Sequence, residues 1–65
     1  MRTEEQMENI QEDLHGLLSR IHDVISRVQK TPMDKKDIVV EELMTLSKNV
    51  DDGITSVRKV IGYLP

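Results

Sequence analysis

The stretch KTPMD, residues 30–34, divides the chain into two long amphipathic halves. Thr31 is a favoured residue type for a helix N-cap, because its hydroxyl accepts a backbone N–H that the first turn leaves unpaired. Pro32 suits the first position of a helix, where its missing N–H costs nothing. The same proline disfavours helical backbone at Thr31, so the preceding helix should end near Lys30. The stretch therefore predicts a tight turn between two helices, and the alternative is one long helix kinked at Pro32.

The first half, residues 3–30, has the hydrophobic periodicity of a packed helix. Its gaps alternate between three and four residues without a break. The series comprises Met7, Ile10, Leu14, Leu17, Ile21, Val24 and Val28. With Leu14 at heptad position a, Leu17 lies at d, and Leu18 and Ile25 lie at e. A stripe three positions wide indicates packing against more than one helix.

The second half, about residues 32–61, repeats this broad apolar pattern. Its apolar residues are Val39, Val40, Leu43, Leu46, Val50, Ile54, Val57, Val60, Ile61 and Leu64. We expect Gly62 to take a left-handed conformation just beyond the helix end, with Pro65 preventing continuation. This second stop signal predicts that the chain is complete.

These patterns predict an all-α fold in a single domain, residues 1–65, with helices at about 3–30 and 32–61 and a turn at 30–32. The helices form an antiparallel two-helix hairpin. A chain of 65 residues without cysteine has little core and no disulfide to support it, so we expect it to dimerise into a four-helix bundle. The predicted oligomer or partner interface comprises Leu14, Leu17, Leu18, Ile21, Ile25, Leu43, Leu46, Val50, Ile54, Val57 and Ile61.

Within this interface we assign Leu18 and Ile25 to the outer edge that meets the second subunit. Leu17 and Ile21 should instead face Leu43 and Leu46 inside the hairpin. Charges agree with an antiparallel pair. Folding about the turn should bring Arg20 near Glu41 and Glu42, and the acidic start of the first helix near Arg58 and Lys59.

Composition argues against several classes of partner. The net charge of −3 and the single aromatic residue do not favour binding to nucleic acid. No apolar run has the length of a membrane span, and the N-terminus lacks the pattern of a signal peptide. We therefore expect no membrane association and a cytoplasmic location.

Two histidines were considered as sites of chemistry. Glu12 and His15 have the Glu-x-x-His spacing of di-iron bundle proteins, but their heptad positions, f and b, lie on the polar face. His15 and His22 are about 10 Å apart along a helix, too far to share one ion. A two-helix hairpin also lacks a concave pocket that could shift a pKa. We predict no metal site, no cofactor and no catalytic residue.

The segment Ile21-His22-Asp23-Val24-Ile25-Ser26 resembles the dimerisation and phosphotransfer helix of one histidine-kinase subfamily. That resemblance implies a hairpin dimer in which His22 is exposed and accepts a phosphoryl group. It covers about six residues, and Arg27 and Gln29 depart from the family pattern. Phosphotransfer signalling through His22 is thus the alternative to our main interpretation. The main interpretation is a non-enzymatic regulator, inhibitor or adaptor that self-associates and binds another protein.

Overall fold

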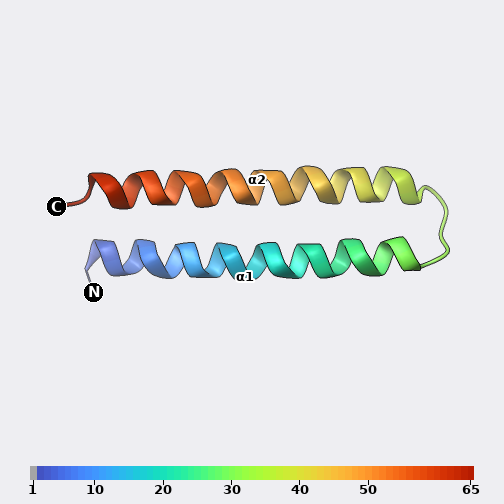
Figure 1. Cartoon of the computed structure of the whole chain (residues 1–65), viewed down its shortest axis with the longest axis horizontal. Coiled ribbons are helices and arrows are strands. Elements are labelled where there is room, and N and C mark those ends of the chain that lie inside the picture. Colours follow the sequence, from blue (N-terminus) through green and yellow to red (C-terminus); the bar gives the residue numbers. More distant parts are fainter. Residues whose placement is uncertain (1) are drawn as a thin grey trace.

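The computed structural model describes residues 2–65 and contains two helices of 28 residues each. Helix α1 spans Thr3–Lys30 and helix α2 spans Lys36–Tyr63. The helices lie side by side and antiparallel, so the start of α1 and the end of α2 lie at the same end of the hairpin (Figure 1). The described residues contain no strand. The prediction of an all-α helical hairpin is therefore confirmed.

Each helix ends where a proline restricts the residue before it. Thr31, before Pro32, is extended at φ −97° and ψ 125°. Leu64, before Pro65, is extended at φ −75° and ψ 143°. The proline ring clashes with helical backbone at the preceding residue, so both helices stop at these positions. Opposite charges also complement the α1 dipole, with Glu4 and Glu5 in its first turn and Arg27 and Lys30 in its last.

The predicted start of the second helix at Pro32 is wrong, because α2 begins at Lys36. Thr31 instead closes the end of α1. Its Oγ1 donates a hydrogen bond to the Arg27 carbonyl at 2.7 Å, and its backbone N–H donates to the Val28 carbonyl. The axes of packed helices lie about 8–10 Å apart. A turn at 30–32 is too short to cross that distance and reverse direction, whereas the loop at 31–35 has a length usual for helical hairpins.

Lys35 makes the final reversal of the chain before α2. Its backbone is left-handed, at φ 57° and ψ 28°, and it is the N-cap residue of the helix. Its carbonyl accepts the N–H groups of Ile38 and Val39, each at 3.1 Å. No side-chain hydrogen bond caps this helix start, and the Lys35 carbonyl begins the hydrogen-bond series of α2.

The left-handed conformation predicted for Gly62 is also wrong. None of the glycines has a positive φ, and α2 continues through Gly62 to Tyr63. The stop depends on Pro65 acting on Leu64, so a left-handed glycine is not needed.

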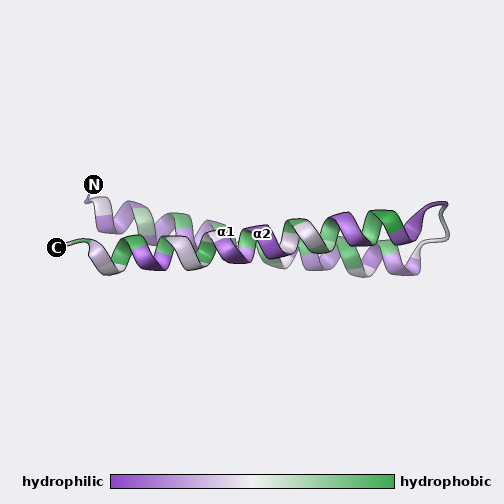
Figure 2. Ribbon diagram, turned by 90° about the horizontal axis from the view of Figure 1, so that it is seen from above, coloured by the Kyte–Doolittle hydropathy of each residue, from purple (hydrophilic) through white to green (hydrophobic). Residues whose placement is uncertain are grey.

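The two helices pack through one heptad series from each, which together we call the seam. Every residue of α1 that is buried or half-buried belongs to the series Met7, Gln11, Leu14, Leu18, Ile21, Ile25 and Val28. On α2 the matching series is Lys36, Val40, Leu43, Ser47, Val50, Ile54, Val57 and Ile61. Gaps of four and three alternate in both, as knobs-into-holes packing requires. Hydrophobic segments recur along both helices and the pair crosses at a shallow angle (Figure 2).

The fully buried part of this seam is small. Only Ile21, Val50, Ile54 and Val57 are buried, and Ile54 is the most enclosed at 2% exposure. Chains of this size bury a small fraction of their surface and are marginally stable as isolated units. Burial of further apolar surface against another protein would therefore stabilise the hairpin.

The left-handed backbone of Lys35 leads to a prediction about stability. Lys35→Gly should raise the free energy of unfolding by about 1 kcal/mol, because a residue with Cβ is strained in this conformation and glycine is not. Denaturant titration followed by circular dichroism measures the change. The control Lys59→Gly, at an exposed position inside α2, should lower stability by about 1 kcal/mol. A loss of stability in Lys35→Gly would contradict the role given to this backbone.

Candidate protein-interaction face

A second apolar line runs along α1 outside the seam. Ile10, Leu17 and Val24 are spaced seven residues apart and are exposed by 44%, 42% and 44%. The sequence had placed Leu18 and Ile25 on the outer edge of the hairpin. That assignment is wrong, because both are half-buried in the seam.

Helix α2 carries a matching line at the same seven-residue spacing. It comprises Val39, Leu46, Gly53 and Val60, of which Leu46 and Val60 are more than 40% exposed. A shallow groove of about 260 Å³ shows that the two lines share one side of the hairpin. It is lined by Leu17, Arg20, Ile21, Val24, Leu43 and Leu46. We call this surface the apolar face and define it as Ile10, Leu17, Val24, Val39, Leu46, Gly53 and Val60.

The structure divides the predicted interface residues between the seam and the apolar face. Leu17 and Leu46 lie on the apolar face. The other nine lie in the seam, where they pack one helix against the other. These are Leu14, Leu18, Ile21, Ile25, Leu43, Val50, Ile54, Val57 and Ile61. The predicted interface lacks five residues of the apolar face, whose signal is a shared heptad position on each helix: Ile10, Val24, Val39, Gly53 and Val60.

Contacts across the seam establish the register of the two helices. A methyl group added at Gly53 would lie 3.8 Å from Cδ1 of Leu14. Nε2 of His22 lies 3.0 Å from Oγ of Ser47. These pairs put Arg20 opposite the segment 47–49, so the expected approach to Glu41 and Glu42 is wrong.

Charged residues border the apolar face on its α1 side. Arg20 lines the groove of that face. Asp13 precedes Arg20 by seven residues, which is about two helical turns. Both residues therefore lie on the same side of α1, next to its apolar line. The same period adds Arg27, so the border carries one acidic group before the helix centre and two basic groups after it.

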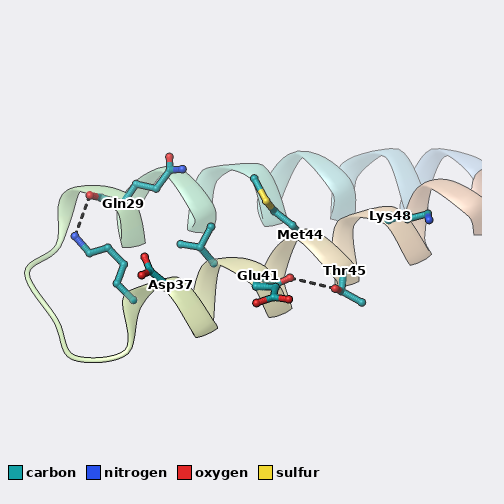
Figure 3. A pocket seen from close by; sticks show the side chains of 8 residues that line it. Gln29, Asp37, Glu41, Met44, Thr45 and Lys48 are labelled. Carbon is teal, nitrogen blue, oxygen red and sulfur yellow. Dashed lines mark hydrogen bonds between the residues drawn. The ribbon is translucent and has the colours of Figure 1, made fainter.

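The opposite side of the hairpin is mostly polar but contains a larger groove. Its volume is about 550 Å³, and it follows α2 near the turn (Figure 3). It is lined by Gln29, Lys36, Asp37, Val40, Glu41, Met44, Thr45 and Lys48. Nζ of Lys36 donates a 3.1 Å hydrogen bond to the Gln29 carbonyl and joins α2 to the end of α1. Met44, 55% exposed, is the one large apolar side chain of this groove that projects strongly into solvent.

His22 lies on this polar side and contacts α2. Its hydrogen bond to Ser47 joins the two helices, and Ser47 is half-buried in the seam. Ser47 interrupts an otherwise apolar stretch of the α2 series, and His22 provides it with a polar partner. The arrangement gives His22 a structural role, since one ring nitrogen is engaged with the neighbouring helix.

Residues 2–65 offer neither a cluster of metal ligands nor a membrane-spanning helix. No group of three or more potential ligands among His, Cys, Asp and Glu gathers in that range. Neither α1 nor α2 has an apolar segment long enough to cross a bilayer. Glu12 and His15 are exposed on the outer surface of α1.

Comparison of the chain with protein-family models, curated proteins and solved structures finds no match to any of them.

The contact between His22 and Ser47 can be measured by a double-mutant cycle. His22→Ala and Ser47→Ala should show a coupling of about 0.5 kcal/mol, because exposed hydrogen bonds lie at the low end of net contributions. The free energies of unfolding of the two single variants and the double variant give the coupling. His22→Ala combined with Ser56→Ala, a serine far from His22 along the hairpin, should show none. Equal values for the two cycles would contradict the contact.

Proposed function

We propose that this hairpin is a non-enzymatic protein-interaction module that self-associates through its apolar face and so forms a four-helix bundle. The observation that carries the proposal is the second heptad line on each helix. Apolar residues at seven-residue spacing beyond the seam are the pattern by which helices pack against further helices. The hairpin itself leaves this line exposed at Leu17, Val24 and Leu46.

A second copy suits the dimensions of the face. The Cα trace measures 50 Å along the hairpin and 16 Å across it. The broad side of the whole hairpin, of which the apolar face is the central part, is thus comparable with the ~800 Å² that each partner contributes to a standard stable interface. Burying this surface would also add to the small core of the hairpin.

The spacing of the face further favours a copy of the same chain. An isologous interface uses one patch twice, so the patch must be complementary to itself under a twofold rotation. Both helices carry an apolar line with the same spacing. In a twofold dimer, each apolar position of one copy can therefore meet an apolar position of the other copy. The border charges, Asp13 and Arg20, are of opposite sign and fit the same rotation.

The resulting bundle is proposed to act as a regulator or adaptor by presenting its outer, polar surface to another protein. The groove around Met44 lies on that outer surface and would stay accessible in the bundle. Shallow grooves of this kind support binding more readily than catalysis, because they do not enclose a reacting group.

Two glutamate substitutions at neighbouring positions distinguish the seam from the apolar face. Leu17→Glu should abolish self-association and leave a helical hairpin, because it puts a charge in the proposed interface only. Leu18→Glu should unfold the hairpin itself, because it buries an unpaired charge between α1 and α2 at a cost of several kcal/mol. Sedimentation equilibrium and circular dichroism over a range of protein concentrations measure both effects.

Ser19→Glu is the matched control, since it adds the same charge on the outer surface of α1. It should change neither association nor helicity. A wild-type protein that stays monomeric and cooperatively folded at high concentration would overturn self-association. The apolar face would then have to bind a different protein.

A further inference from the structure

Gly53 is the one position of the apolar face without a side chain. Glycine inside a helix lowers helix stability relative to alanine, so a glycine at position 53 needs a physical reason. The hairpin does not supply one. A methyl group at Gly53 would meet only Cδ1 of Leu14, at 3.8 Å, which is an ordinary van der Waals contact. A helix of a partner that approaches α2 closely at this position would supply such a reason.

The apolar face is symmetric about the middle of the hairpin. On α2, residues 46 and 53 are equally distant from the helix centre, between residues 49 and 50, and so are residues 39 and 60. On α1, Ile10 and Val24 are equally distant from Leu17, which lies near the centre of that helix. The register of Leu14 with Gly53 puts the α2 centre at the level of residues 17 and 18 of α1, beside Leu17.

A twofold axis perpendicular to the helices at this level pairs α1 with α1 and α2 with α2, both antiparallel. Such an axis sets Leu46 of each copy opposite Gly53 of the other. It also sets Val39 opposite Val60, and Ile10 opposite Val24. The large leucine thus meets the position that has no side chain, as close packing of two helices requires.

We infer that Leu46 of one copy inserts into the notch at Gly53 of a second copy, and that this contact, made twice, determines the register of the dimer. The inference rests on the proposed self-association and adds its geometry. The border charges agree with it. Positions 13 and 20 lie four and three residues from Leu17 on its two sides, so this axis puts Asp13 of each copy near Arg20 of the other. Opposite charges at this place favour the antiparallel pairing of the two α1 helices.

An exchange of the two residues tests this pairing. Leu46→Gly alone leaves an empty space opposite Gly53, and Gly53→Leu alone forces two leucines into one place. Each should raise the dissociation constant of the dimer by at least about tenfold. The double variant L46G/G53L restores one leucine opposite one glycine and keeps the amino-acid composition. Its dissociation constant should return to within about threefold of the wild-type value, because the two changes are coupled.

Sedimentation equilibrium gives these constants, and its outcomes separate the two proposals. A dimeric wild-type protein whose double variant shows the sum of both losses would overturn the notch pairing and leave self-association intact. That result would arise if α1 of one copy packed on α2 of the other. A wild-type protein that is monomeric at every concentration would overturn both.

Alanine substitutions at two glycines provide a second measurement. Gly53→Ala should strengthen helix formation but weaken the dimer by about threefold or more, because the methyl group fills part of the notch. Gly16→Ala is the matched control, because Gly16 lies on the outer surface of α1 with nothing within 4 Å of an added methyl group. It should strengthen helix formation without weakening the dimer. Equal dimer affinities in the two variants would contradict the close approach at Gly53.

Discussion

The seam between α1 and α2 is the interaction on which the rest of the structure depends. Isolated helices are marginal in water, and most helical stability in proteins comes from packing an apolar side against a neighbour. Here each helix has one neighbour, and four buried aliphatic side chains form the most enclosed part of the contact. The seam uses two of the three apolar heptad lines on each helix. The third line remains at the surface, and this remainder makes association with another helix pair physically reasonable.

The helix ends show what local sequence rules could predict. Pro32 and Pro65 act on the residue immediately before each of them, so the ends of α1 and α2 follow from covalent geometry alone. The start of α2 cannot be predicted from such local rules. Thr31 has the chemistry of a cap in either direction, and its hydroxyl bonds back to Arg27 rather than forward. The loop length depends on the distance between two packed helices, which is a tertiary property that cap rules do not contain.

The apolar face was harder to predict because two phases of the same pattern fit α1 almost equally well. Starting from Leu14 and Ile21, either Leu17 or Leu18 continues an alternating series of three and four. The better guide lies in α2, where Gly53 occupies one line and Ile54 the other. A bulky β-branched residue fills a seam and glycine does not, so this pair favours the phase that the structure adopts, whereas Leu46 beside Ser47 favours the other phase. The expectation that Leu18 lies at the outer edge rests on α1 alone, where both phases fit.

The start of α1 and the end of α2 lie at the same end of the hairpin, beside each other and remote from the turn (Figure 1). In the perpendicular twofold arrangement inferred above, the turn of one copy lies over the ends of the other. The ends of the two chains would then leave the bundle at opposite poles, separated by about the 50 Å length of one hairpin. Anything attached to those ends would be held apart by a rod of fixed length.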